Sequence, residues 1–215
     1  MVGTQQLLLH RLPNEIAISF LGKVITPICS ARDLRIILDN NLTYDQHIHQ
    51  ITSLCMAQLC QINRVKSTFD RNTLRTIISA LVLSKLFYCS TVWSITAAEN
   101  IKKLQAVQNF ACRIITKTKK FEHITPMLHK IKWLLVNEHL HYRDTVMAFR
   151  CIKSLAPTFL CESFQKHKCI HYHNTRNSQS LDIPPSKTKS GRAVNISNNL
   201  DKDFKQLSLT SFKKS

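Results

Sequence analysis

The sequence predicts a mainly α-helical protein that begins with a small β-strand prefix and ends in a basic, loosely structured tail. From about residue 43 to residue 155, apolar residues recur every three or four positions, which is the period of an amphipathic helix. Before that region, short apolar runs alternate with turn-forming residues, as in short strands. Only three glycines and six prolines among 215 residues argue against a turn-dense all-β fold. We therefore expect strands in residues 1–42, a helical bundle in 43–168 and a linker or tail in 169–215.

The strand prefix is expected to contain three short strands. Apolar and polar residues alternate over 15–21, which predicts a strand. Gly22-Lys23 is expected to form a turn, after which Val24-Ile25 form the returning strand. A third strand is expected over 34–38, closed by the turn-forming residues Asp39, Asn40 and Asn41.

The first two helices are predicted from their apolar faces and their capping residues. A helix over about 44–65, which Thr43 or Asp45 can cap, has an inner face of Ile48, Ile51, Cys55, Leu59 and Ile62. A second helix, which Asp70 or Asn72 can cap, has a wide inner face of Leu74, Ile77, Ile78, Leu81, Val82 and Leu86. So wide an apolar face predicts a central position in the bundle.

Two more helices complete the predicted bundle. The third spans about 99–116 and has an inner face of Ile101, Leu104, Val107, Ala111 and Ile114. The fourth begins near residue 136, ends before Pro157 and has an inner face of Leu140, Val146, Met147 and Ile152. After about residue 169 the helical period fades into a polar segment with a Pro184-Pro185 break. Four such helices indicate a helical bundle.

The net charge of the chain favours a polyanionic partner. Lys and Arg number 30 against 13 Asp and Glu, so the net charge is +17. The excess is concentrated in residues 101–215, which carry 21 basic and seven acidic residues, against nine and six in residues 1–100. A basic half of this size is typical of nucleic-acid binding, although a merely solvated Lys-rich surface gives the same count. The three glycines fit no Gly-rich phosphate-binding loop.

The eight cysteines are interpreted as free thiols in a reducing compartment. Five of them lie among apolar residues and are expected to be buried: Cys55, Cys60, Cys89, Cys112 and Cys151. The apolar run over residues 7–9 is too short for a secretory signal, so we expect an intracellular protein, in the nucleus or the cytoplasm. The longest apolar stretch, 77–88, is interrupted and too short to cross a bilayer.

Two further kinds of site are weak in this sequence. Cysteine and histidine cluster within thirteen residues, which suggests zinc, but their spacing fits no common finger and a polar loop with incidental histidines explains them more simply: Cys161, His167, Cys169, His171 and His173. A Cys–His hydrolase is rejected because no base or orienting partner is identifiable. No metal site is therefore predicted.

Several segments, in order along the chain, resemble the end of the reverse transcriptase of non-LTR (LINE-type, jockey-like) retrotransposons. The most specific is KLQAVQNFACRII at 103–115, which is similar to the family helix KLQxVQNxAxRxI. The others are ARDLRIILDNNLTYDQHI at 31–48, ALVLSKLFYC at 80–89, FEHITPML at 121–128, IKWLLV at 131–136 and LAPTFL at 155–160. Shorter matches continue at 175–176, 185–189 and 211–214, and the opening residues 1–7 resemble a palm strand.

The chain departs from the family pattern at three places. Arg35 stands where the family usually has Gly, Leu135 stands where it has Pro, and a Trp-containing stretch is reduced to Asn198-Asn199-Leu200. These departures are typical of a relaxed copy. The resemblance otherwise implies the end of a palm, a helical thumb and a downstream region.

The catalytic carboxylates of such a polymerase are missing from this sequence. Template-directed nucleotide addition requires carboxylates that hold two divalent ions about 4 Å apart. The resemblance implies that the parent enzyme takes them from an early palm strand and an adjacent Asp-Asp pair, with Mg²⁺ as cofactor. No two carboxylates are adjacent here, and the closest aspartates, Asp201 and Asp203, lie in the predicted tail. We therefore expect no polymerase activity and no cofactor for this chain on its own.

The candidate binding residues form a basic stripe on the third predicted helix. Lys102, Asn109, Arg113 and Lys117 are expected opposite the apolar face, where they can meet the phosphates of a template–primer duplex. The remaining candidates are Lys103, Lys119, Lys120, Arg143 and Arg150. The alternative is an ordinary solvated face. Trp93 and Trp133 are interpreted as packing residues and not as platforms for bases.

Two functions remain open from the sequence. The first is a truncated, non-catalytic reverse transcriptase fragment that binds RNA or RNA–DNA duplex without sequence preference. The alternative is a helical scaffold whose basic face contacts acidic proteins. The sequence indicates no membrane partner and leaves the oligomeric state undetermined.

Overall fold

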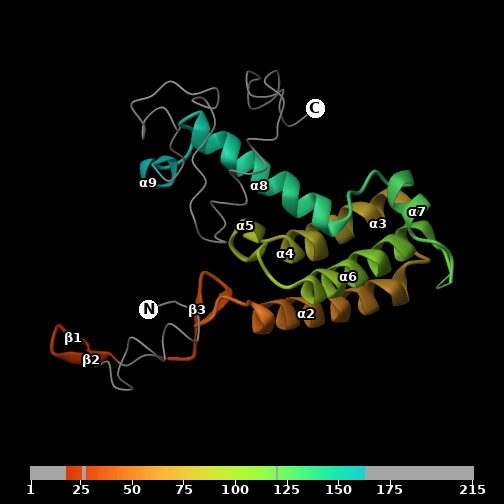
Figure 1. Ribbon diagram of the computed structural model, residues 1–215. Coiled ribbons are helices and arrows are strands. Elements are labelled where there is room, and N and C mark those ends of the chain that lie inside the picture. The colour runs from red at the N-terminus through yellow and green to blue at the C-terminus, as the bar shows by residue number, and fades with distance from the viewer. Residues whose placement is uncertain (1–17, 26–27, 120, 163–215) are drawn as a thin grey trace. The chain divides into compact units, whose positions relative to one another are not determined.

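The computed structural model describes residues 18–25, 28–119 and 121–162, and it confirms a mainly helical chain with a short β prefix (Figure 1). The chain divides into two compact units, Met1–Val136 and Asn137–Ser215, and each is treated separately below. The predicted boundaries at 42 and 168 stay a prediction. The predicted tail, 169–215, lies outside the described residues.

The described part of the prefix contains two separate antiparallel hairpins. Strands β1 (Ile18–Phe20) and β2 (Lys23–Ile25) pair across a two-residue turn, and β3 (Ser30–Asp33) pairs with β4 (Ile36–Asp39). The predicted turn at Gly22-Lys23 is wrong by one residue, because Lys23 pairs with Phe20 and the turn is Leu21-Gly22. Both turn residues have positive φ, 50° and 74°, which matches the twist of paired strands.

The predicted strand over 34–38 is confirmed only from residue 36 onward, where it belongs to β4. Leu34 and Arg35 form the turn of the second hairpin, with φ of 44° and 68°, and the strands lie on either side of them. A left-handed backbone favours Gly, since a side chain there crowds the neighbouring carbonyl. The resemblance implies glycine at position 35, and glycine would adopt this left-handed conformation with less strain than Arg35 does.

We predict that Arg35→Gly stabilises the second hairpin. Removing the side chain relieves a left-handed strain of about 1 kcal/mol, less the entropy that Gly adds to the unfolded chain. A small rise in the urea midpoint is the expected result, whereas Arg32→Gly on the exposed strand β3 should lower the midpoint. A loss of stability as large as that of the control would contradict the turn assignment.

The Asp39 carboxylate holds the residues that lead into helix α2 (Asp45–Val65). That carboxylate accepts hydrogen bonds from the backbone N–H groups of Asn41 (3.1 Å), Thr43 (2.9 Å) and Tyr44 (2.7 Å), and from the Thr43 hydroxyl (3.2 Å). The predicted caps were therefore largely wrong, since Tyr44, in a left-handed conformation, occupies the cap position with no side-chain cap. Thr43 contributes only a long contact of 3.4 Å from the Asp45 N–H to its hydroxyl.

The second helical segment consists of α3 (Arg71–Ile78), the π-helical turn η1 (Ser79–Leu83) and α4 (Ser84–Leu86). Asp70 caps it as predicted, accepting from the N–H groups of Asn72 and Thr73. The buried side chains are spaced by four: Leu74, Ile78, Val82 and Leu86. A spacing of four exceeds the 3.6 residues of an α-helical turn, and the wider π turn takes up the difference.

The π turn corrects the predicted inner face. Leu81 is 48% exposed and Ile77 is half-buried, although both were expected inside. The prediction assumed an uninterrupted α-helix, so it included two residues that are not fully buried.

The core of the first unit lies between α2, the α3–α4 segment and α6 (Ala98–Thr116), which pack together (Figure 1). Helix α6 contributes Leu104, Val107, Ala111 and Ile114 as predicted, while Ile101 is only half-buried. Two short helices that were not predicted, α5 (Ser90–Trp93) and α7 (Thr125–Lys130), connect the larger ones. Trp93 is fully buried, and its indole N–H donates to the Tyr88 carbonyl at 2.9 Å.

The second unit contains α8 (Val136–Ile152), whose first residue still belongs to the first unit, and α9 (Thr158–Cys161). The predicted bounds of α8 are confirmed, but its inner face was partly wrong. Leu140 is buried as predicted, whereas Val146, Met147 and Ile152 are half-buried. The other buried residues of α8 are Val136, Asp144, Ala148, Phe149 and Cys151.

The cysteines of the described residues are free thiols. Cys55, Cys112 and Cys151 are buried as predicted, whereas Cys60 is exposed and Cys89 is intermediate. Burial raises the pKa of the Cys55 and Cys112 thiols to about 11. Within the described residues, no helix combines the length and hydropathy needed to span a membrane.

Candidate nucleic-acid interface

The first two candidate residues of α6 lie near its beginning and are engaged with neighbours. Lys102 is exposed and forms an ion pair with Glu99 at 2.8 Å. Lys103 donates to the Asn100 side-chain oxygen at 3.2 Å. Lys102 lies fifteen residues before Lys117, which is about 22 Å along the helix.

The middle of the predicted stripe is not a free surface. Asn109 is half-buried and accepts from the Gln105 amide at 2.8 Å. Arg113 is also half-buried, and its Nη2 atom donates to the Glu122 carbonyl at 3.4 Å. The Arg113 Nε atom is buried without a hydrogen-bond partner in the described part of the chain. The prediction of one exposed stripe is therefore wrong, because the connection after α6 folds back over Arg113.

The last candidates of this region lie where α6 ends. Lys117 terminates the helix in a left-handed conformation, φ 56°, and its side chain is exposed. Lys119 is exposed, and its backbone N–H donates to the Glu122 carboxylate at 2.9 Å. Lys120 lies outside the described residues.

The two candidates on α8, Arg143 and Arg150, belong to the second unit. Both are exposed. Arg143 lies close enough to His139 to influence it: burial, and then the positive charge of Arg143, lower the pKa of His139 to about 4. These two arginines are therefore not counted with the residues of α6.

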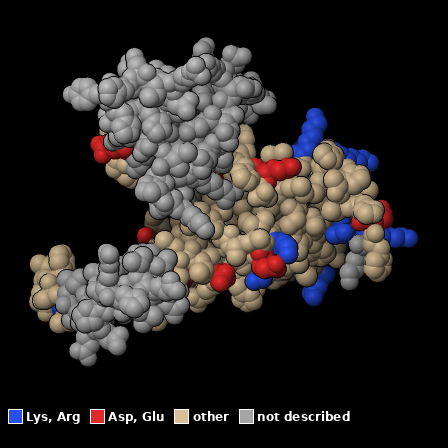
Figure 2. Space-filling model, viewed as in Figure 1, with Lys and Arg blue, Asp and Glu red and all other residues tan. Residues whose placement is uncertain are grey.

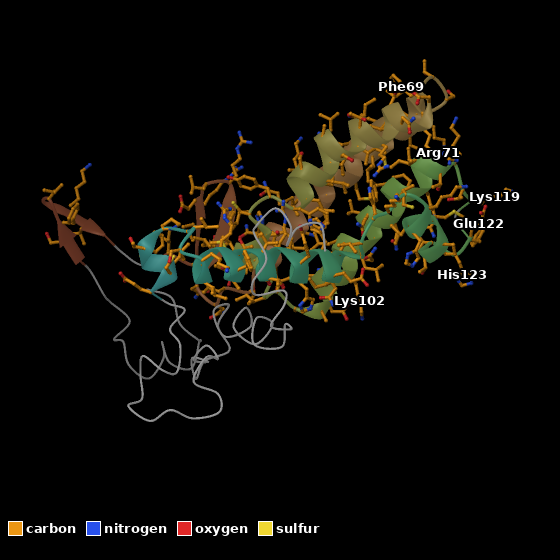
Figure 3. The ribbon with its side chains drawn as sticks, turned by 90° about the horizontal axis from the view of Figure 1, so that it is seen from above. Phe69, Arg71, Lys102, Lys119, Glu122 and His123 are labelled. Atoms are coloured by element: carbon orange, nitrogen blue, oxygen red, sulfur yellow. The ribbon has the colours of Figure 1, made fainter. Side chains whose placement is uncertain are left out.

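The structure gathers a basic surface that the sequence did not reveal. Helices α2 and α6 end at the same end of the first unit, where α3 begins (Figure 1). We call this surface the basic tip and define it by Arg64, Lys66, Arg71, Lys117 and Lys119. Figure 2 shows Lys and Arg concentrated toward this end. In Figure 3, Arg71 and Lys119 lie at one end, well apart from Lys102.

None of the five basic side chains of the tip is ion-paired in the part of the chain that the structure describes. Two carboxylates lie among them, and both are engaged with backbone groups. Asp70 caps α3, and Glu122 accepts from the Lys119 N–H. Hydrogen bonds from Thr73, led by its side chain, lower the pKa of Asp70. The tip therefore carries five cations against two ionised carboxylates that do not pair with them.

Part of the positive charge of the basic tip stabilises helix ends. Positive side chains in the last turn of a helix interact favourably with its negative dipole end, and Arg64 and Lys117 stand at two such ends. That contribution needs only one cation at each end. Arg71 stands at a helix beginning, where the dipole disfavours it, so helix stabilisation does not explain the whole tip. Unpaired cations gathered at one end of the unit are suited to bind phosphate groups.

The described residues contain no group of three His, Cys, Asp or Glu side chains placed to hold a metal ion. Of the five residues weighed for zinc, four lie beyond the described range, and Cys161 donates to the Ala156 carbonyl at 3.3 Å. No two acidic residues are adjacent among the described residues, so these residues do not fit the two-magnesium polymerase site that the resemblance implies.

A buried histidine lies on α2. His47 is 3% exposed, its ring centre lies 6.3 Å from that of Trp93, and its Nε2 atom lacks a hydrogen-bond partner in the described part of the chain. Burial lowers the pKa of His47 below its usual value of 6.5. The protonated form is therefore disfavoured in the folded chain.

We predict that stability falls as the pH drops below about 6.5. The unfolded chain then takes up a proton on His47 more readily than the folded chain, so the stabilisation present at neutral pH is lost on acidification. His139, with its pKa near 4, adds to the loss down to about pH 4. His47→Leu makes the urea midpoint less dependent on pH between 7 and 5, whereas His49→Leu, at an exposed site on the same helix, leaves that dependence unchanged. If the urea midpoint depended equally on pH in the two variants, His47 would not be the source of this dependence.

Together these features define a helical unit with a basic end, and comparison with known proteins relates the chain to transposon polymerases. The chain is 31% identical over 107 residues to the probable RNA-directed DNA polymerase from transposon BS of Drosophila melanogaster, which is 48% of this chain and 12% of that protein. It is 24% identical over 115 residues to the probable RNA-directed DNA polymerase from transposon X-element of the same organism, 52% of this chain and 13% of that protein.

These similarities relate about half of the chain to the RNA-directed DNA polymerases of transposons. The match spans about an eighth of the length of these two relatives. No protein-family profile matches the chain, and no solved structure matches it.

Proposed function

We propose that this chain is a non-catalytic, thumb-like part of the reverse transcriptase of a non-LTR retrotransposon, and that it binds RNA or RNA–DNA duplex without sequence preference. The single observation that carries the proposal is the basic tip. Five unpaired cations from three helix ends converge there, in a chain whose relatives are named as RNA-directed DNA polymerases. The sequence matches that suggested the end of a palm and a thumb support the placement within the parent enzyme.

The binding expected from this surface is mainly electrostatic. Lysine and arginine contacts to phosphates release condensed counterions, so affinity falls steeply with salt and carries little sequence information. Five phosphate contacts on a duplex give a slope of log K against log salt of about −4.5. The same contacts on a single strand give about −3.5.

A salt titration tests this proposal directly. The full chain is titrated onto a fluorescein-labelled random-sequence RNA and onto the RNA–DNA duplex formed from it, between 50 and 300 mM KCl. We expect binding of both, with the slopes given above and similar affinity for unrelated sequences. Absence of binding at 50 mM would overturn the proposal and favour the acidic-protein partner instead.

We also propose that the chain has no polymerase activity by itself and that it acts in the cell interior, in the nucleus or the cytoplasm. The absence of adjacent carboxylates from the whole sequence supports the first statement. Primer extension on a poly(rA)–oligo(dT) template with Mg²⁺ or Mn²⁺ is expected to match a no-enzyme control. Nucleotide incorporation above that control would contradict it.

A further inference from the structure

The connection between α6 and α7 presents an exposed aromatic side chain beside the basic tip. Phe121 is 94% exposed, more than Phe20 at 62% or Phe159 at 67%. Figure 3 shows its neighbours in sequence, Lys119, Glu122 and His123, at the same end of the first unit as Arg71 and Phe69. A large apolar ring in this position gains nothing from the core of the unit.

The connection is held in a defined shape. The Glu122 N–H donates to the Lys119 carbonyl at 3.3 Å, and the Glu122 carboxylate accepts from the Lys119 N–H at 2.9 Å. Arg113 of α6 donates to the Glu122 carbonyl at 3.4 Å. Lys119 and Glu122 thus hold each other, and Arg113 ties Glu122 to α6, next to Phe121 in the chain. These contacts come from Glu122, Lys119 and Arg113, so the ring of Phe121 is not needed for them.

The charged residues around the Phe121 ring indicate which kind of ligand it could bind. Lys117 and Lys119 precede it in the chain, and Arg71 lies at the same end of the unit (Figure 3). An exposed aromatic ring among cations is the combination that binds single-stranded nucleic acid, because the cations meet phosphates while the ring stacks on a base. The bases inside a duplex are stacked on both faces by their neighbours, so apart from the two end pairs only an unpaired base has a free face for the ring.

Resting on the proposed function, we propose that Phe121 stacks on an unpaired base, so that the basic tip binds a single strand, or a single-stranded end beside a duplex, more tightly than a blunt duplex. The cations supply the affinity common to both forms of nucleic acid. Phe121 supplies the preference for the unpaired form.

The test compares two variants on two matched probes. The probes are a fluorescein-labelled 20-nucleotide RNA and the blunt RNA–DNA duplex made from it, at 150 mM KCl. Phe121→Ala is expected to weaken single-strand binding about tenfold, which is within the range for the loss of one stacked base, and to change duplex binding less than twofold. Phe121→Trp is expected to retain the single-strand affinity. Phe159→Ala, an exposed phenylalanine of the second unit, is the matched control and is expected to change neither affinity.

A base analogue gives an independent readout. 2-Aminopurine at an unpaired position of the RNA changes its fluorescence when an aromatic ring stacks on it. We expect a change on binding of the unmodified chain that is absent with Phe121→Ala. The salt slope is expected to be the same in both, because stacking releases no phosphate counterions.

The outcomes separate the two proposals. If the unmodified chain binds neither probe, the proposed function fails and the inference fails with it. If it binds both probes with the expected salt slopes but Phe121→Ala is unchanged, or loses both affinities equally, only the stacking inference is overturned. Loss of binding to anionic lipid vesicles in Phe121→Ala, with RNA binding intact, would also overturn it and identify the ring as a membrane contact.

Discussion

The variant Arg71→Gln, Lys117→Gln, Lys119→Gln should bind RNA–DNA duplex about a hundredfold more weakly than the unmodified chain at 0.15 M salt. Each lost phosphate contact removes about 0.9 from the salt exponent, so three lower the slope from about −4.5 to about −2. Extrapolated from 1 M salt, where this contribution vanishes, the same three contacts account for about two decades of affinity. Fluorescence anisotropy at several salt concentrations measures both quantities. The loss should be equal for unrelated sequences, since phosphate contacts carry no base information.

A second triple variant is the matched control. Lys85→Gln, Lys102→Gln, Lys103→Gln removes the same charge from exposed positions of the first unit outside the tip. We expect this variant to keep most of the slope and the affinity, because long-range effects of these charges are screened beyond about 10 Å. Equal losses in the two variants would mean that the whole basic surface binds diffusely and that the tip has no special part.

The variant Trp93→Ala should lose about 3–5 kcal/mol of unfolding free energy, the largest effect we expect from a single substitution. Trp93 is the largest fully buried side chain of the described residues, and its indole N–H donates to the Tyr88 carbonyl. Truncation leaves a cavity and an unsatisfied carbonyl. A domain typically has 5–15 kcal/mol of stability, so this loss brings the first unit close to unfolding. Urea denaturation followed by circular dichroism measures it.

Two comparisons show whether Trp93 acts through packing. Val92→Ala, at a half-exposed neighbour on the same short helix, should cost much less. Trp93→Phe keeps an aromatic ring in the core, so it should keep most of the stability and all of the RNA affinity. A folded Trp93→Phe chain that binds RNA poorly would contradict the interpretation of Trp93 as a packing residue.

Long helices with regular apolar faces were predictable from the sequence. Helix α6 was predicted within one residue at its start, and its buried residues largely match the predicted face, because an uninterrupted α-helix keeps its phase. The face of the second helical segment was predicted less well. The π turn at Ser79–Leu83 changes the phase, and single-sequence periodicity does not register such a turn.

Local turns were less predictable. The second hairpin places Leu34 and Arg35 at positive φ, and neither residue type signals a turn. The approach to α2 depends on the Asp39 carboxylate, which accepts from the N–H groups of Thr43 and Tyr44, whereas α2 itself has no side-chain cap of the predicted kind. In both places the local conformation depends on partners that are not next to each other in the sequence.

The candidate interface was predictable only in part. The sequence identified Lys117 and Lys119 but not Arg64, Lys66 and Arg71, which lie more than forty residues earlier in a half of the chain with little net charge. Only the packing of α2 and α3 against α6 brings the two groups to one end. Arg113 shows the opposite error: a helical wheel places it on the exposed face, but the connection that follows α6 partly covers it.

Photochemical cross-linking tests the central claim most directly, because it shows where RNA lies on the chain. RNA containing 4-thiouridine is bound to the full chain at 100 mM KCl, irradiated, digested and analysed by mass spectrometry for cross-linked peptides. The account predicts cross-links concentrated in residues 64–75 and 117–123, on the two sides of the basic tip. Cross-links confined to α8 around Arg143 and Arg150, or to the beginning of α6 around Lys102, would contradict it.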